Sequence, residues 1–283
     1  MSDFGPIISA KELAGLLGEN DLVVLDCRFD LMRPSAGREA WRESHVPSAS
    51  YLDLDKDLSS EPGPATGRHP LPEADNLRCT FGRAGVGPNS RVVVYDASSG
   101  GIASRAWWLL KWLGHERVAL LERGFSGWVE DGHPIESGET EGEAQTFPVR
   151  AAARAIVTTE EVAAGLGDPE RLRLVDAREA GRYRGEHEPI DHKAGRIPGA
   201  RNLPFTDLVD AEGRFLKPDD LRQRFAAVLG DDRSRPWVAM CGSGVTACHL
   251  AIAADVAGYA EPALYVGSFS EWIQNTDRPV HTG

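Results

Sequence analysis

The feature that most constrains the fold is an internal repeat, because the motifs of the first half of this 283-residue chain return in the second half. Four segments recur in the same order, as expected of a duplicated unit. The paired segments are 8–13 with 157–162, 23–28 with 172–178, 45–52 with 196–203, and 91–96 with 236–241. A chain of this length can hold two domains of ordinary size. We therefore expect two domains of the same fold.

The paired segments predict the same elements in both halves. Ser9 is followed by Glu12, and Thr158 by Glu161, which is the capping signature of a helix start. The second and fourth pairs contain short apolar runs of the kind that form buried parallel strands. Strands that alternate with helices predict an α/β fold in which each domain has a parallel sheet with helices on both faces.

The stretch between the two copies has the composition of a linker. Residues 131–154 are rich in Gly, Pro and Glu and show no apolar periodicity. The sequence therefore predicts a first domain at residues 1–135, a linker at 136–154 and a second domain at 155–283.

The charge and the cysteine content exclude several classes of protein. With 43 acidic and 31 basic side chains, the formal charge of −12 disfavours nucleic acid and anionic membranes as partners. The N-terminus lacks the basic and apolar regions of a secretory signal, and no stretch is a convincing membrane span, so we expect a cytoplasmic protein. Four cysteines without a Cys-x-x-Cys pair indicate reduced thiols rather than a disulfide framework or a structural zinc site.

The two halves differ at the end of one predicted strand, where the first has Asp96 and the second has Cys241. The following residues predict a tight loop that leads into a helix. Gly242 and Gly244 let the backbone curl so that its amides point inward, and the helix adds its positive N-terminal end. Such a loop suits an anionic sulfur, so Cys241 is a candidate nucleophile. A buried, inert thiol is the alternative interpretation of an unpaired cysteine.

The loop at 241–247 and the tandem repeat resemble the two-domain rhodaneses. The form Cys-Gly-Ser-Gly-Val-Thr-Ala is similar to that of the 3-mercaptopyruvate sulfurtransferases, and the resemblance spans nearly the whole chain. It implies two tandem rhodanese-like domains, of which the first is catalytically silent because Asp96 stands at the cysteine position. It also implies that Cys241 attacks the sulfur of a donor, becomes a persulfide, and passes that sulfur to an acceptor.

The resemblance implies a small-molecule sulfur donor and no metal or organic cofactor. The expected acceptor is cyanide, a low-molecular-weight thiol or a thioredoxin-like protein. Thiosulfate-preferring relatives carry basic residues directly after the cysteine, whereas this chain has Gly242 and Ser243 there. A neutral loop suits 3-mercaptopyruvate, with Ser243 and backbone amides polarising the departing group. The loop residues expected to bind the substrate are Gly242, Gly244, Val245 and Thr246.

The resemblance also implies an arginine that grips the carboxylate of the substrate. It lies in a Gly-Arg-aromatic motif, which makes Arg182 the candidate here. A second family arginine normally follows Glu-Pro, but this chain has Ile190 at that position. Either Arg184, His192 or Lys193 takes over the role, or the grip is weaker and the specificity broader. The other interpretation of Arg182 is a surface or interdomain ion pair.

A histidine of the first domain completes the expected site. His69, in the segment Arg-His-Pro-Leu-Pro, matches the family histidine that reaches toward the active cysteine, and Asp55 matches the acid that orients it. Together with Cys241 and Ser243, these groups would move the proton that pyruvate formation requires. The other interpretation of His69 is a solvated or packing residue.

Other functions remain as alternatives. A cysteine-dependent phosphatase would need an arginine six residues after the cysteine, where this chain has Ala247. A thiosulfate sulfurtransferase and a non-enzymatic persulfide carrier or binding module are compatible with the same loop.

Residues outside the loop are expected to be structural. Asp-x-Arg follows the same strand in both halves, at 26–28 and 176–178, including the half without the cysteine. Cys248 is expected to be packed, and Cys27 and Cys79 have no neighbouring motif.

Overall fold

The computed structural model describes residues 4–140, 142–148 and 154–283, and the chain divides into two compact units. We call them the N-terminal unit and the C-terminal unit. The N-terminal unit comprises Met1–Ser60, Leu71–Ala153 and Ala211–Arg214. The C-terminal unit comprises Glu61–Pro70, Arg154–Asp210 and Phe215–Gly283.

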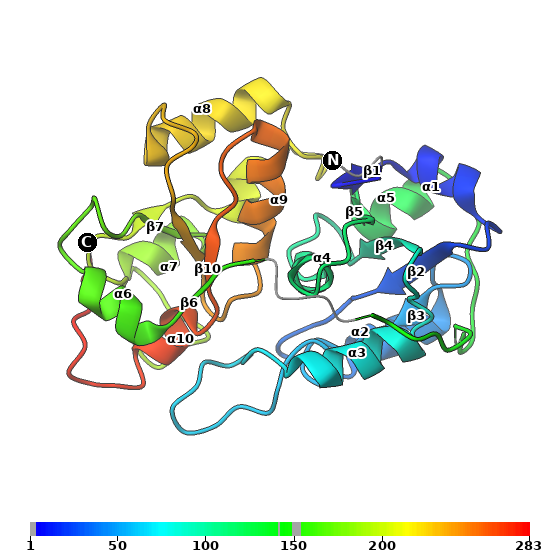
Figure 1. Ribbon diagram of the computed structural model, residues 1–283, viewed down its shortest axis with the longest axis horizontal. Coiled ribbons are helices and arrows are strands. Elements are labelled where there is room, and N and C mark those ends of the chain that lie inside the picture. The colour runs from blue at the N-terminus through cyan, green and yellow to red at the C-terminus, as the bar shows by residue number, and fades with distance from the viewer. Residues whose placement is uncertain (1–3, 141, 149–153) are drawn as a thin grey trace. The chain divides into compact units, whose positions relative to one another are not determined.

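The N-terminal unit is built on a five-stranded parallel sheet with the order β1-β5-β4-β2-β3. Its strands are β1 (Ile7–Ile8), β2 (Leu22–Asp26), β3 (Ser50–Tyr51), β4 (Arg91–Tyr95) and β5 (Val118–Leu121). Its helices are α1 (Ala10–Leu16), α2 (Ala36–Glu43), α3 (Ala74–Arg83), α4 (Ala103–Trp112) and α5 (Gly124–Glu130). These elements are labelled in Figure 1. All of β5 and most of β4 are buried. Because successive strand residues point to opposite faces, both faces of the sheet are covered.

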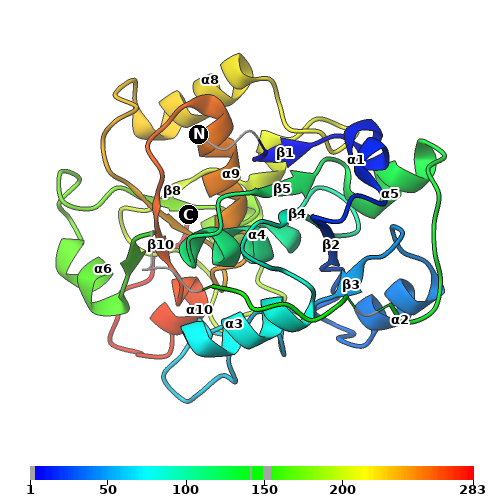
Figure 2. The same ribbon diagram turned by 45° about the vertical axis from the view of Figure 1, so that its right-hand side comes forward.

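The C-terminal unit repeats this topology, with a five-stranded parallel sheet in the order β6-β10-β9-β7-β8. Figure 2 shows the structure from a second direction. Its strands are β6 (Ile156–Val157), β7 (Leu174–Asp176), β8 (Arg201–Asn202), β9 (Val238–Met240) and β10 (Ala263–Tyr265). Its helices are α6 (Thr159–Gly165), α7 (Ala180–Arg184), the 3₁₀ helix η1 (Phe205–Leu208), α8 (Pro218–Leu229), α9 (Ala247–Ala257) and α10 (Ser268–Trp272). The predicted α/β class and the duplication are confirmed.

Both predicted capping boxes are present. The amide of Glu12 donates to Oγ of Ser9 (3.3 Å) and the amide of Ser9 donates to the Glu12 carboxylate (2.9 Å). Thr158 and Glu161 make the same pair of bonds, at 3.2 and 2.8 Å. Each box satisfies two backbone donors at the start of a helix.

The Asp-x-Arg motifs are buried ion pairs with the same design in both units. Nη2 of Arg28 lies 2.6 Å from the Asp26 carboxylate and also donates to the Ser44 carbonyl. Nη2 of Arg178 lies 2.8 Å from the Asp176 carboxylate and donates to the Gly195 carbonyl (2.8 Å). Each pair joins the end of a central strand to a neighbouring turn, which confirms the expected structural role.

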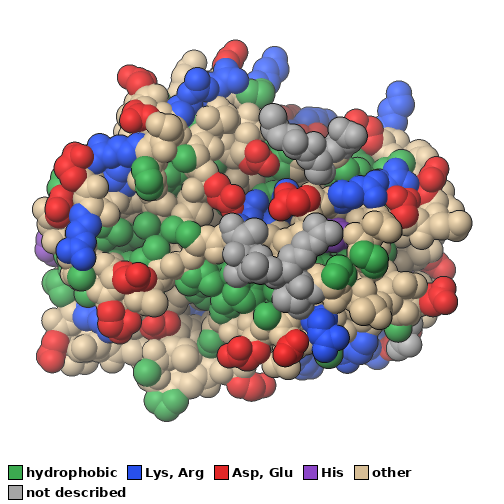
Figure 3. Space-filling view, in the orientation of Figure 1, with side chains coloured by type: hydrophobic (Ala, Val, Ile, Leu, Met, Phe, Trp, Pro, Cys, Tyr) green, Lys and Arg blue, Asp and Glu red, His purple; other side chains and the backbone are tan. Residues whose placement is uncertain are grey.

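The surface carries charges of both signs. On the face drawn in Figure 3, acidic side chains are scattered among basic ones. Among the described residues, no helix is both long and apolar enough to cross a membrane.

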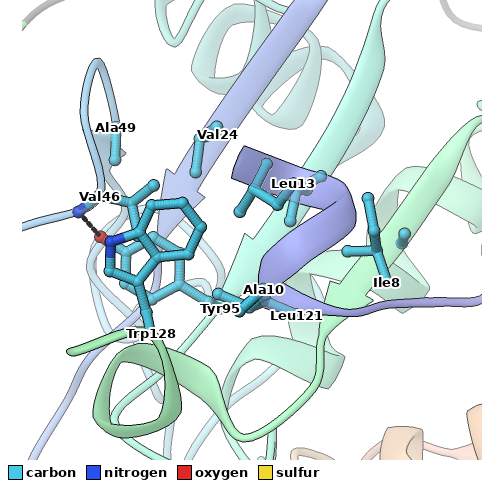
Figure 4. Close-up of a cluster of buried hydrophobic side chains, with 11 residues drawn as sticks. Ile8, Ala10, Leu13, Val24, Val46, Ala49, Tyr95, Leu121 and Trp128 are labelled. Atoms are coloured by element: carbon cyan, nitrogen blue, oxygen red, sulfur yellow. Dashed lines mark hydrogen bonds between the residues drawn. The ribbon is translucent and has the colours of Figure 1, made fainter. Parts of the chain in front are cut away.

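Buried apolar side chains hold each sheet to its helices. In the N-terminal unit, Leu13 of α1 and Trp128 of α5 pack on the same side of the sheet as Val24 of β2 (Figure 4). Tyr95 is the polar member of this cluster, and its hydroxyl accepts a hydrogen bond from the amide of Val46 (3.2 Å). A corresponding cluster around Trp272 fills the C-terminal unit.

Two segments lie differently from the predicted domain bounds. Of the expected linker 136–154, residues 149–153 lie outside the described residues. Residues 136–140 and 142–148 belong to the N-terminal unit, where the amide of Gln145 donates to the Gly82 carbonyl (2.9 Å) and Phe147 is buried beside Phe81. Residues 61–70, expected within the first domain, belong to the C-terminal unit. We call them the 61–70 segment, and the amide of Arg68 fixes it by donating to Oγ of Ser270 (3.1 Å).

Candidate active site

Cys241 is the first residue after β9, and the loop that follows it leads into α9, as predicted. Gly244 has a φ of +74°, a conformation that side chains with a Cβ rarely adopt. A Cβ at this position would lie only 2.4 Å from the carbonyl oxygen of Val266. The sharp curl of the loop therefore depends on glycine at position 244.

Two hydrogen bonds connect Cys241, at the start of the loop, to the first residues of α10. The amide of Cys241 donates to Oγ of Ser268 (3.1 Å), and its carbonyl accepts from the amide of Phe269 (3.1 Å). In the part of the chain that the structure describes, the amides of Ser243, Val245 and Thr246 are donors in none of the hydrogen bonds. Cys241 itself is 2% exposed. A negative charge in this loop would find main-chain donors that no protein group has taken.

The corresponding loop of the N-terminal unit contains an anion of its own. Asp96 follows β4, and its Oδ1 accepts from the amides of Ser98 and Gly100, both at 3.0 Å. Its Oδ2 accepts from the amides of Ile102 (2.8 Å) and Ala103 (3.1 Å) at the start of α4. In the duplicated fold, the turn between this strand and this helix thus forms a cradle for a negatively charged group.

His69 reaches the loop of Cys241 from the 61–70 segment. Its Nδ1 lies 2.7 Å from Oγ of Ser243, and both residues are buried, with exposures of 5% and 6%. A hydrogen bond between an imidazole and a hydroxyl lets the pair donate or accept a proton next to the nucleophile.

Two guanidinium groups flank the loop. Arg182 of α7 forms a bidentate ion pair with Glu188, from Nε to Oε2 at 3.1 Å and from Nη2 to Oε1 at 2.8 Å, and its Nη2 also lies 3.1 Å from Asp191. Arg68 pairs with the other carboxylate oxygen of Asp191. A Cβ built on Gly242 would lie 2.9 Å from Nη2 of Arg68 and 3.7 Å from Nη2 of Arg182. Both positive groups are therefore adjacent to the residue after Cys241.

The pKa of Arg68 depends on its burial and on its neighbour Cys241. Burial lowers the pKa of the Arg68 guanidinium, and the nearby Cys241 opposes that shift. A guanidinium nevertheless stays protonated in proteins, so the charge persists at neutral pH.

The structure brings most of the predicted site residues together in the C-terminal unit. Cys241, Ser243, His69 and Arg182 all lie at the loop, together with its other residues Gly242, Gly244, Val245 and Thr246. Asp55 belongs to the N-terminal unit, where its amide donates to Asp53 (3.0 Å). The proposed role of Asp55 therefore stays a prediction.

Arg68 was not among the predicted site residues, although it directly precedes His69 in the sequence. Of the residues considered as substitutes for the missing second arginine, Arg184 is half-exposed and pairs with Glu186 (2.6 Å). His192 and Lys193 follow Asp191 in the same loop, and no side-chain hydrogen bond to the site is present for either within the described ranges.

No group of three or more His, Cys, Asp and Glu side chains suited to a metal ion occurs among the described residues. Cys248 is buried, and its Sγ lies 3.4 Å from the carbonyl of Gly244, as expected of a packed residue.

Comparisons with known proteins agree with this architecture. The family model of rhodanese-like domains matches residues 9–131 and 158–275. A probable 3-mercaptopyruvate sulfurtransferase of Pseudomonas aeruginosa is 46% identical over 282 residues, which cover 98% of both chains. The 3-mercaptopyruvate sulfurtransferase of Homo sapiens is 39% identical over 258 residues, covering 89% of this chain and 84% of the human one.

A solved structure gives the same result at the level of the fold. The 3-mercaptopyruvate sulfurtransferase from Leishmania major superposes with a TM-score of 0.85 at 29% identity, covering 98% of this chain and 76% of the other. The repeated sheets and the loop at Cys241 are consistent with these matches. The chain therefore belongs to the family of proteins with rhodanese-like domains, of which it carries two in tandem.

Proposed function

We propose that the protein is a sulfurtransferase that moves sulfur from 3-mercaptopyruvate to a thiol or cyanide through a persulfide on Cys241. The observation that carries the proposal is the position of Cys241, at the start of a loop with available amides and beside two guanidinium groups. Relatives that bear the name 3-mercaptopyruvate sulfurtransferase match the chain over nearly its full length.

In the first half-reaction, the thiolate of Cys241 attacks the sulfur of the donor. A sulfur–sulfur bond forms while the carbon–sulfur bond breaks, and its electron pair stays on carbon as the enolate of pyruvate. Protonation of that carbon releases pyruvate, and the buried pair of Ser243 and His69 is placed to supply the proton. Arg182 binds the carboxylate of the donor, and the loop amides stabilise the persulfide anion.

In the second half-reaction, an acceptor attacks the outer sulfur and restores the thiolate of Cys241. The acceptor is cyanide, a low-molecular-weight thiol or a thioredoxin-like protein. No metal or organic cofactor takes part, because the persulfide carries the sulfur. The net charge of −12 argues against nucleic acid as a partner, and we place the reaction in the cytoplasm.

We also propose that the N-terminal domain, residues 1–135, is catalytically silent, and that the second domain, residues 155–283, carries the nucleophile. The carboxylate of Asp96 occupies the cradle that would otherwise receive sulfur. The 61–70 segment, which belongs to the C-terminal unit, supplies His69 to the site.

The test compares wild type with Cys241→Ser and Cys248→Ser. We expect 3-mercaptopyruvate to add one sulfur to the wild-type peptide that contains Cys241, detected by intact-mass and peptide mass spectrometry. Cys241→Ser should lower transfer to cyanide by roughly 10³-fold or more, because the nucleophile is lost. Cys248→Ser is the matched control and should keep most of the activity. Comparable losses in both variants would contradict a single nucleophile.

A thiosulfate sulfurtransferase is the second candidate, and one observation favours it. The loop itself lacks basic residues, but Arg68 brings a positive charge next to Gly242, where a compact dianion could bind. Measuring kcat/KM for both donors separates the two functions. We expect the higher value for 3-mercaptopyruvate, and a clear preference for thiosulfate would reverse the assignment. A protein that accepts sulfur from neither small molecule would be a persulfide carrier.

A further inference from the structure

The N-terminal unit contains a cavity of about 360 Å³ that shares no residue with the site around Cys241. It lies between α2, the edge strand β3, α3 and the segment around Thr140, and every residue that lines it belongs to the N-terminal unit. Cavities of this volume hold small organic molecules. The lining residues that define its chemistry are Arg38, Trp41, Tyr51, Asp57 and Arg83.

Two arginines line the cavity with hydrogen-bond donors that are unused among the described residues. Nη2 of Arg38, in the first turn of α2, lies 3.8 Å from the Glu139 carboxylate. Nη2 of Arg83, the last residue of α3, lies 3.7 Å from the Asp57 carboxylate. Both contacts are longer than a hydrogen bond. Glu139 instead accepts from Nε of Arg42 (2.6 Å). Each guanidinium group therefore keeps a fork of donors that matches a carboxylate.

Arg38 has the same place in the repeat as Arg182. In both units the helix after the Asp-x-Arg strand starts with Ala-Gly-Arg, in α2 and in α7. The two arginines differ in their partners, because Arg182 makes a bidentate ion pair with Glu188. Arg38 makes no such pair among the described residues. The duplicated position thus carries an available guanidinium group in the N-terminal unit.

Trp41 and Tyr51 form an aromatic wall of the cavity, with ring centroids 5.8 Å apart. Nε1 of Trp41 donates to the Ala49 carbonyl (2.8 Å), and the Tyr51 hydroxyl donates to the Arg28 carbonyl (3.1 Å). Because these bonds engage their polar atoms, the two side chains offer the cavity mainly apolar ring surface. The guanidinium carbon of Arg38 lies 5.9 and 6.0 Å from the two ring centroids. A positive group and a flat apolar surface therefore lie side by side.

The charges at the cavity favour a ligand with one negative charge. Among the described side chains that line the cavity or pair with its lining, Arg38, Arg42 and Arg83 are positive, and Asp57 and Glu139 are negative. Burial raises the pKa of the Asp57 carboxyl, and the charges of Arg83 and Arg38 oppose that shift, so both guanidinium groups act at the same place. Since one positive charge is left over, a monoanion is attracted more than a neutral or cationic molecule.

We propose that this cavity binds an aromatic carboxylate, with the carboxylate between Arg38 and Arg83 and the ring against Trp41 and Tyr51. The site is separate from sulfur transfer and does not depend on the proposed function. It gives the domain that lacks a cysteine after β4 a ligand of its own.

Isothermal titration calorimetry of the full chain with phenylacetate tests the proposal. Acetate lacks the ring and phenylacetamide lacks the charge, so these two molecules are the matched ligands. Phenylacetate should bind more tightly than either by about 10-fold or more, and Arg38→Ala and Arg83→Ala should each weaken its binding by about 10-fold, the loss expected for a charged hydrogen bond. Arg78→Ala changes a half-exposed arginine of α3 outside the cavity and should bind phenylacetate as wild type does.

Hydrogen exchange with and without phenylacetate locates the bound molecule. Peptides that cover residues 36–43 and 74–84 should gain protection, and Arg182→Ala should bind phenylacetate as tightly as wild type. Protection at 241–247 instead, or weaker binding in Arg182→Ala, would place the molecule at Cys241 and overturn the proposal. No binding, equal affinity for the three ligands, or wild-type affinity in both Arg38→Ala and Arg83→Ala would also refute it. None of these readouts uses sulfur transfer, so they remain valid if the proposed function fails.

Discussion

The four cysteines have the same side chain, and their surroundings decide how each one reacts. Cys27 is fully buried, and burial raises the pKa of its thiol well above the ordinary value, with Asp26 and Asp96 acting in the same direction. Cys79 is exposed on α3. Cys248 is buried at the start of α9. Only Cys241 combines a loop of available amides with neighbouring guanidinium groups among the described cysteines.

In the folded protein, Cys27 should be alkylated more slowly than Cys79 because their surroundings differ. A raised pKa leaves less thiolate at every pH below it, so Cys27 should stay unmodified between pH 7 and 9 while Cys79 reacts. Quantitative peptide mass spectrometry after a short exposure to iodoacetamide measures both sites in one sample. Unfolding in urea should make Cys27 as reactive as Cys79, which serves as the control. Equal labelling of the two in the folded state would disprove the proposed environment of Cys27.

At the scale of the element, the site depends on the turn between β9 and α9. Gly244→Ala should lower transfer by about 100-fold, because a displacement of the loop by about 1 Å is enough to misplace the nucleophile. The added Cβ would meet the Val266 carbonyl at 2.4 Å in a backbone conformation with φ of +74°. The measurement is kcat/KM together with the urea midpoint of unfolding.

Gly199→Ala is the matched control for that variant. Gly199 has a φ of +80°, but a Cβ there would meet nothing within 4 Å. The strain of a left-handed alanine should lower the free energy of unfolding of this variant by about 1–2 kcal/mol. Its activity should stay at the wild-type level. If Gly199→Ala loses as much activity as Gly244→Ala, backbone strain rather than the contact with Val266 explains the loss.

The elements that could be predicted are those with a local signal. The capping boxes at Ser9 and Thr158 and the apolar runs of β4 and β9 lie in consecutive residues, and the turn after Cys241 is marked by two glycines. The sequence therefore placed the strand, loop and helix around the nucleophile.

What could not be predicted depends on contacts between distant parts of the chain. Arg68 meets Asp191 across more than a hundred positions, and neither residue has a periodic or spaced pattern around it. The same reason explains why the 61–70 segment was expected in the first domain: its contact with Ser270 leaves no trace in local composition. His69 is predicted as a site residue only by the family resemblance.

At the scale of the whole molecule, one fold appears twice with two different residues, Asp96 and Cys241, at the same turn. Both sheets have the same strand order, and both turns follow the central strand paired with the Asp-x-Arg strand. In the N-terminal unit the anion is the covalently attached carboxylate of Asp96, which never leaves. In the C-terminal unit the residue is Cys241, and we propose that it gains and loses an outer persulfide sulfur in each turnover.

This difference predicts effects of different size on the free energy of unfolding when the two residues are replaced by alanine. Asp96→Ala should lower the free energy of unfolding by about 3 kcal/mol or more, because four amides lose a charged acceptor in a buried turn. Cys241→Ala removes the proposed activity but should change stability by about 1 kcal/mol or less, since no main-chain donor depends on its sulfur among the described hydrogen bonds.

Hydrogen exchange localises these effects without assuming that the two-domain chain unfolds in one step. Peptides that cover residues 96–105 should lose protection in Asp96→Ala, while peptides that cover 241–250 should keep theirs in Cys241→Ala. Asp96→Asn keeps one acceptor oxygen and should fall between wild type and Asp96→Ala. If Asp96→Ala keeps full protection at 98–103, the carboxylate does not hold the turn, and the parallel between the two loops no longer supports an anion cradle at Cys241.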